Sequence, residues 1–227
     1  MTGSEAAGIV LLSLKISATA MLFAVPVAFI VAWVLARREF FGKSLLQALV
    51  TLPLVMPPVV TGYLLLVVFG RSGSLGKAFH AIGINFAFQW TGAALAAAVM
   101  AFPLLVRPMR LSIEALDRGL EDAAATLGAG AVTRFFTITL PLVLPGVIAG
   151  AVLGFAKALG EFGATITFVS NIPGETQTLS LAIYSLLQSP SGDQAVIMLI
   201  TISACLAIGS VLLSEWVGRQ IAQRGRA

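Results

Sequence analysis

The sequence predicts an all-α integral membrane protein with five transmembrane helices. Three observations indicate this class: 58% of the 227 residues are hydrophobic, only 11% are charged, and the apolar residues gather in five long segments. A soluble domain carries about 25% charged residues, which keep its surface hydrated. In lipid the backbone N–H and C=O groups must form hydrogen bonds within the protein, so membrane spans are helices or closed β-barrels. The segments lack the short alternating strands of a barrel, which leaves helices.

The apolar segments are each long enough to cross about 30 Å of hydrocarbon as a helix. We place the spans at approximately 9–36, 45–69, 90–106, 142–169 and 195–217, all within one transmembrane domain over 1–227. The first is expected to be a permanent span, because no basic stretch precedes it as in a signal peptide. In the second, Pro57 and Pro58 predict a break, and irregular backbone at membrane depth must line a cavity or be covered by protein.

Basic residues predict the orientation of the chain. Ten of the 14 Lys and Arg residues follow the first, third and fifth spans: Arg37, Arg38, Lys43, Arg107, Arg110, Arg118, Arg134, Arg219, Arg224 and Arg226. Cytoplasmic loops are enriched in Lys and Arg, so the N-terminus is expected outside and the C-terminus inside. The net charge of +4 then reflects topology. Nucleic acid is not an expected partner, because the basic residues form no stripe with interleaved aromatics.

The outer segment after the fourth span contains a short apolar stretch at about 178–188. We interpret it as a helix that lies at the outer face or re-enters the membrane. A sixth span here is the alternative, but it would place the basic C-terminus outside, against the charge rule.

The segment at about 112–141, on the expected cytoplasmic side, is rich in charge. Leu116, Leu120, Ala124 and Leu127 recur at helical spacing, and Gly128 and Gly130 predict the end of that helix. A second short helix is expected to lead to Pro141 at the start of the next span. Such a projecting helix with small side chains suits docking into a groove of another protein.

This segment resembles the EAA loop of ABC importer permeases. Asp122, Ala123 and Ala124 stand at the Glu-Ala-Ala positions, although Asp replaces the usual Glu and Glu121 precedes it. Gly128, Ile138, Leu140 and Pro141 follow at the motif's spacing. The resemblance implies a type I ABC importer permease fold, in which residues 121 to 128 form a coupling helix that contacts a separate ATPase subunit.

Three further stretches, at 52–60, 160–165 and 171–176, resemble bacterial molybdate permeases. The resemblance implies a multi-pass permease of the bacterial inner membrane with a periplasmic N-terminus and a cytoplasmic C-terminus. It implies two copies of this chain, two copies of the ATPase and a periplasmic molybdate-binding protein, with lipid around them. Sulfate, thiosulfate and tungstate remain alternative solutes.

Residues expected along the translocation path or gate are Pro57, Pro58, Gly160, Glu161, Phe162, Gly163 and Thr165. Small and hydroxyl-bearing walls would let a tetrahedral dianion pass without trapping it. Glu161 has two interpretations, because charges inside the membrane are costly and often functional. It forms either a gate element or a neutralising pair with Lys157 four residues earlier. Lys15 is expected to extend its ammonium group towards the interface.

The chain itself is not expected to be an enzyme or to bind a cofactor. Gly42, Lys43 and Ser44 resemble the end of a nucleotide-binding loop, but Arg37 stands where that motif needs glycine. ATP and magnesium are therefore expected on the partner subunit. A metal site is not expected from one cysteine, Cys205, and one histidine, His80. An ATP-independent transporter or channel is the alternative of another class, although no internal repeat is visible.

Overall fold

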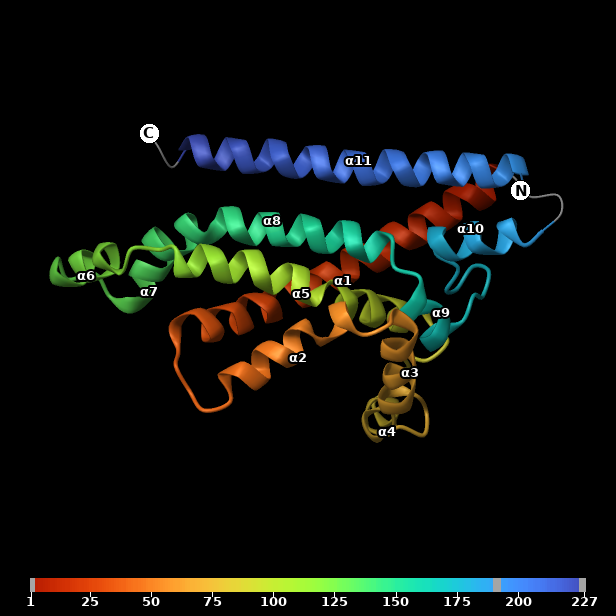
Figure 1. Ribbon diagram of the computed structural model, residues 1–227, viewed down its shortest axis with the longest axis horizontal. Helices are drawn as coiled ribbons and strands as arrows, with labels where there is room; N and C mark the ends of the chain where they lie inside the picture. Colours follow the sequence, from red (N-terminus) through yellow and green to blue (C-terminus); the bar gives the residue numbers. More distant parts are fainter. Residues whose placement is uncertain (1–2, 190–192, 225–227) are drawn as a thin grey trace.

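The computed structural model describes residues 3–189 and 193–224, and every regular element in these ranges is helical (Figure 1). Four long helices run along the long axis of the molecule: α1 (Gly3–Arg37), α5 (Trp90–Glu114), α8 (Leu140–Leu159) and α11 (Asp193–Arg224). Each contains a stretch long and apolar enough to cross a membrane. A fifth span results among the described residues if the bent pair α2 (Lys43–Val55) and α3 (Pro58–Phe69) counts as one.

Small residues form the contacts between α1, α5 and α8 at the centre of the protein. Gly146, Gly150 and Gly154 repeat every four residues along α8 and are buried against α5. Alanines repeat in the same way on the buried face of α1, at Ala20, Ala24, Ala28 and Ala32. Lipid provides no hydrophobic driving force for helices to associate, so the helices are held together by the close van der Waals contact that small residues permit.

The second expected span is broken at Met56 and Pro57, where α2 and α3 meet at an angle of 116°. Pro57 has no N–H to continue the helical ladder, and Pro58 begins the next helix. The helix α3 leaves the bundle sideways and carries α4 (Ser74–Ala81) at its tip (Figure 1). Most apolar side chains of α2 and α3 remain exposed within the single chain.

The fourth expected span, 142–169, is not continuous: α8 ends at Leu159, and α9 (Gly163–Val169) follows a break at 160–162. This corrects the sequence-based boundary, because Gly160 and Gly163 interrupt the helix and α9 turns to pack against α3. The third span is longer than expected and continues to Glu114. Three of the basic residues that predicted the orientation have side chains outside the described part of the chain: Arg219, Arg224 and Arg226.

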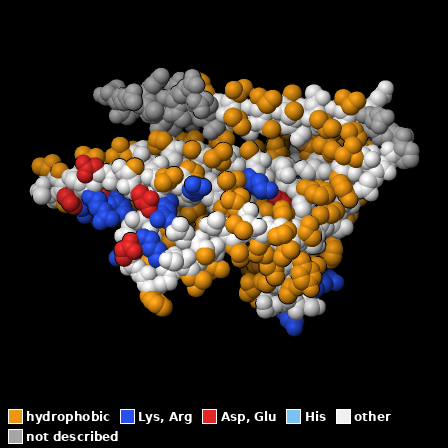
Figure 2. All heavy atoms as spheres, viewed as in Figure 1, with side chains coloured by type: hydrophobic (Ala, Val, Ile, Leu, Met, Phe, Trp, Pro, Cys, Tyr) orange, Lys and Arg blue, Asp and Glu red, His pale blue; other side chains and the backbone are white. Residues whose placement is uncertain are grey.

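The two short helices expected between the third and fourth spans are present as α6 (Arg118–Thr126) and α7 (Ala131–Arg134). A π-helical turn, η1 (Phe135–Thr139), joins α7 to α8, and Pro141 lies in the first turn of α8. The stretch at 178–188 forms α10 (Leu179–Leu187), a helix too short to span. In Figure 2, most acidic and basic side chains gather towards the end of the molecule that carries α6 and α7, whereas hydrophobic side chains cover the region of α3.

We predict that Gly146→Ala destabilises the protein. The added Cβ would lie 2.0 Å from the Ser112 Oγ and 2.8 Å from the Pro108 carbonyl oxygen, so α5 and α8 would have to separate. Overpacking of this kind costs about 1–3 kcal/mol. Thermal unfolding of the purified protein in detergent measures the effect. Gly209→Ala is the matched control, because its Cβ would meet no atom within 4 Å; an equal loss of stability in both variants would contradict the packing argument.

Candidate functional site

The projecting end of the protein is built from α6, α7 and the turn between them. The Asp117 carboxylate accepts a hydrogen bond from the Gly119 backbone N–H at 2.8 Å and begins α6. Gly128 ends the helix with a φ of +88°, a left-handed conformation that side chains with a Cβ rarely adopt. Ala129 N–H then donates to the Ala124 carbonyl oxygen at 3.0 Å, which closes the turn.

Glu121 attaches this projecting end to the membrane helices. Its carboxylate is 3.0 Å from the Arg37 guanidinium at the end of α1, and it accepts a hydrogen bond from Thr139 in η1. The Arg134 guanidinium donates to the Glu121 carbonyl oxygen at 3.3 Å. The two ion-paired side chains are only 11% and 20% exposed, so water screens their attraction weakly. Glu121 thereby joins α1, α6, α7 and η1.

Aromatic side chains support the same junction from the membrane side. Phe135 in η1 packs edge-on against Trp33 and Phe29 of α1, with ring centroids 5.8 and 6.2 Å away. The Arg37 guanidinium lies over the Trp33 ring at 5.1 Å, an attractive cation–π contact. The ion pair and the rings therefore fix one another's positions.

The remaining residues of the motif divide into an exposed surface and a stem. Asp122, Ala123 and Gly128 are exposed, and Ala124 is half-buried. Leu127 is 88% exposed and Val132 is 71% exposed, which leaves large apolar side chains uncovered beside them. Ile138 and Leu140 are half-buried and Pro141 is exposed, where η1 continues into α8. We refer to the exposed group Leu120, Asp122, Ala123, Leu127, Gly128 and Val132 as the knuckle surface.

The structure brings together the two groups of residues expected along the path. Pro58 begins α3 and Gly163 begins α9, and a Cβ on Gly163 would lie 2.7 Å from the Pro58 Cβ. One turn further along α3, a Cβ on Gly62 would lie 2.4 Å from the Ala164 carbonyl oxygen. The breaks in the two spans therefore face each other, and their glycines permit the close approach.

Glu161 is buried, with 2% of its surface exposed. Its carboxylate accepts a hydrogen bond from Lys157 and another from the Ala164 backbone N–H at 3.0 Å, in the first turn of α9. The pairing interpretation thus agrees with the geometry, and the carboxylate also caps α9. The Phe162 ring lies 4.9 Å from the Tyr184 ring of α10. Thr165 is buried in this conformation, so its hydroxyl lines no open channel.

Lys15, whose ammonium group was expected to extend towards the interface, contacts an aromatic side chain. Its ammonium nitrogen is 3.7 Å from the centre of the Trp90 ring, at the beginning of α5. The ammonium group is thus held by a cation–π contact with Trp90, a residue type that is enriched at membrane interfaces.

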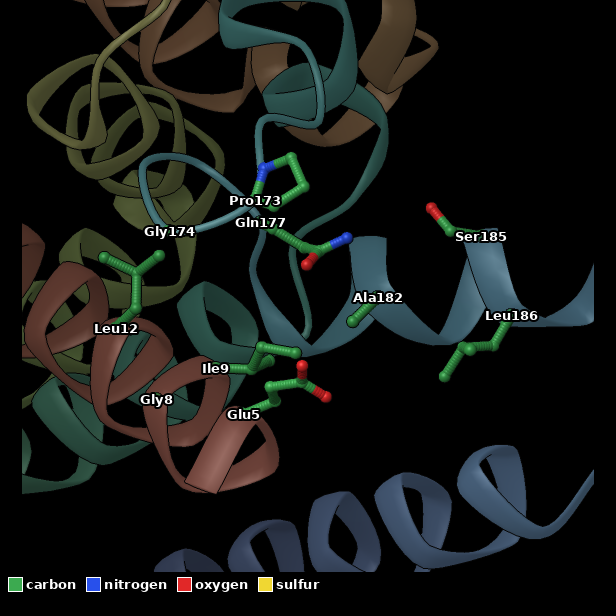
Figure 3. Close-up of a pocket in the computed structure, with 10 residues that line it drawn as sticks. All are labelled: Glu5, Gly8, Ile9, Leu12, Pro173, Gly174, Gln177, Ala182, Ser185 and Leu186. Atoms are coloured by element: carbon green, nitrogen blue, oxygen red, sulfur yellow. The ribbon is translucent and has the colours of Figure 1, made fainter. Parts of the chain in front are cut away.

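Sequence reasoning missed a cavity of about 620 Å³ at the end of the molecule opposite the knuckle surface. Figure 3 shows Glu5, Ile9 and Leu12 of α1, Pro173 and Gln177 of the loop after α9, and Ser185 of α10 around it. The only local signal was the Pro173–Gly174 turn, in which Gly174 has a φ of +78°. Among the described residues, no three His, Cys, Asp or Glu side chains gather as a metal site requires.

Comparison with known proteins identifies the family. Residues 24–223 match the family described as binding-protein-dependent transport system inner membrane component. The chain belongs to this family of permeases. It is 55% identical to the molybdenum transport system permease protein ModB of Haemophilus influenzae over 214 residues, 94% of this chain and 93% of the relative. It is 58% identical to ModB of Escherichia coli K12 over 211 residues, 92% of each chain.

A solved structure of a permease from a bacterial ABC transporter for alginate import has the same fold. It superposes with a TM-score of 0.75 and covers 97% of this chain and 81% of that one, at 20% sequence identity. The type I ABC importer permease fold expected from the sequence is thus confirmed, although at this identity the likeness concerns the fold alone.

We predict that Glu121→Ala loosens α6 without unfolding the membrane helices. The substitution leaves the Arg37 charge and the Thr139 hydroxyl without their acceptor, and hydrogen bonds to charged groups contribute about 1.5–3 kcal/mol each. Limited proteolysis within 115–134 should become faster, while the thermal unfolding of the spans changes little. Asp122→Ala removes a neighbouring exposed carboxylate that has no such partners among the described residues, and it serves as the control. Equal proteolysis of the two variants would argue against the Glu121 junction.

Proposed function

We propose that this chain is the membrane-spanning permease subunit of an ATP-driven importer that carries molybdate across the bacterial inner membrane. The observation that carries the proposal is the 55–58% identity to two permeases named for molybdenum transport, over more than nine tenths of each chain. The family's dependence on a binding protein supports a periplasmic molybdate-binding protein as the partner that selects the solute.

A second copy of the chain completes the path. One copy has four spans, or five with the bent pair, among the described residues, and the apolar faces of α2 and α3 are uncovered. Two such faces around a common axis would enclose a path between the facing breaks at Pro58 and Gly163. The buried Glu161 is neutralised by Lys157, so it does not repel an entering dianion. Pro57, Gly160 and Phe162 lie at these two breaks and are proposed as gate residues with them. Thr165, in the first turn of α9, is proposed to reach the path only when the gate opens, because it is buried in this conformation.

The knuckle surface is where an ATPase subunit would dock, one on each copy of the permease. Its apolar side chains are left exposed by the described part of the chain, and its small residues permit close approach. When the ATPases close on ATP, they would move α6. The Glu121 junction would transmit that movement to the end of α1, and η1 would transmit it to α8. The N-terminus is then periplasmic and the C-terminus cytoplasmic.

Uptake of labelled molybdate tests the proposed solute. Cells that lack this chain should lose molybdate uptake at submicromolar concentrations, and expression of the chain should restore it. Excess sulfate should inhibit the restored uptake weakly. Undiminished uptake in the deletion strain, or abolition by equimolar sulfate, would refute the molybdate assignment; competition with tungstate measures the discrimination between the two similar dianions.

Leu127→Asp tests the docking surface. The change places a charge where an apolar contact with the ATPase is proposed, and because Leu127 is 88% exposed the permease fold should not change. We expect the ATPase to copurify at least about tenfold less well, which corresponds to about 1.4 kcal/mol. Leu127→Met, which keeps an apolar side chain, is the control. Full copurification of the Asp variant would show that the ATPase binds elsewhere.

A further inference from the structure

A second cavity, of about 410 Å³, lies between α2 and α5 and has no role in the function proposed above. A hydrogen bond of 3.0 Å from the Arg110 guanidinium of α5 to the Gln47 side-chain oxygen of α2 shows that these two residues lie at the same level of the bundle. The two helices are antiparallel, so residues seven positions before Arg110 and seven after Gln47 also lie at one level. These residues are Pro103 and Leu54, and both line the cavity.

The lining of this cavity changes in character from one end to the other. At the end near the bundle's charged terminus are Gln47, Arg107, Arg110 and Glu114. Deeper in the cavity the walls are Leu54, Pro103 and Leu104. At the helical rise of about 1.5 Å per residue, they lie about 10 Å from the level of Arg110 and about 5–6 Å from that of Arg107. A polar end and an apolar end at this separation match a molecule with a charged head and a hydrocarbon tail.

The polar end of the cavity carries one net positive charge, from Arg107, Arg110 and Glu114 together. Arg110 forms an ion pair with Glu114 at 2.7 Å, so these two charges compensate each other. Arg107 is exposed and has no ion pair or hydrogen bond among the described residues. Its guanidinium, with several N–H donors in one plane, is suited to binding phosphate oxygens. A phosphodiester carries a single negative charge and would balance it.

We propose that this cavity binds an anionic phospholipid, with its phosphodiester on Arg107 and an acyl chain along the wall formed by Leu54, Pro103 and Leu104. Basic pockets between transmembrane helices on the cytoplasmic side commonly hold such headgroups. A free oxyanion such as molybdate fits less well, because the apolar wall offers it nothing and a dianion exceeds the single uncompensated charge. The inference does not depend on which solute the permease carries.

The experiment uses the permease with its ATPase in lipid nanodiscs that contain phosphatidylglycerol with a photoreactive acyl chain. Illumination and mass spectrometry should locate cross-links on α2 and α5. Arg107→Gln should lower this labelling about fivefold, since one basic residue near a membrane surface contributes about 1 kcal/mol. Thr51→Trp, which fills the cavity from an exposed position on α2, should lower it as well. Arg38→Gln removes another exposed guanidinium outside the cavity and should leave labelling unchanged.

Each of four other results would overturn the proposal. Equal labelling of wild type and Arg107→Gln would exclude phosphate binding at that residue. Equal labelling by phosphatidylethanolamine would remove the requirement for an anionic lipid. Displacement of the probe by excess molybdate in the buffer would assign the cavity to a free oxyanion. An absence of labelling on α2 and α5 in the wild-type complex would mean that a second copy of the chain covers the cavity.

Discussion

The whole architecture depends on how closely α1, α5 and α8 approach each other. In a bilayer a leucine side chain gains little free energy when it exchanges contact with lipid acyl chains for contact with another helix. Helix association therefore comes from close van der Waals contact and from the few polar groups that meet. The four-residue repeats of glycine on α8 and alanine on α1 create that contact along each helix. Several other elements pack directly on this three-helix unit: α11 on α8, α2 and α9 on α5, and α10 on α1.

Two carboxylates join helices of this unit, one at its end and one inside it. At the end with α6 and α7, the Arg37–Glu121 ion pair is partly shielded from water. Glu121 also accepts hydrogen bonds from the Thr139 hydroxyl and, at its carbonyl oxygen, from the Arg134 guanidinium. Inside, Glu161 is compensated by Lys157 and by the first turn of α9. In both places a carboxylate joins helices that meet at a break or a turn, where backbone groups would otherwise lack partners. These two carboxylates therefore lie where regular helices meet or stop.

The sequence predicted features that depend on local chemistry. The helical spacing of Leu116, Leu120, Ala124 and Leu127, ended by Gly128, predicted the first short helix and its turn. Pro57 with Pro58 predicted the break in the second span. Features that depend on distant partners were not predictable. Arg37 and Glu121 are separated by 84 positions, so nothing near Glu121 indicated that its carboxylate would turn inward. The break at 160–162 was hidden because Lys157 and Glu161 have the spacing of a continuous helix, and only the contact of Gly163 with Pro58 explains the bend.

The two cation–π pairs on α1 have a consequence for the bilayer itself. Lys15 rests on Trp90 and Arg37 on Trp33, and along the helix the two cations are about 33 Å apart at about 1.5 Å per residue. That separation is close to the thickness of a hydrocarbon core, about 30 Å. With one cation at each interface, α1 would resist sliding along the membrane normal. A thinner or thicker bilayer would therefore have to deform around α1, or tilt the bundle, before either cation left its ring.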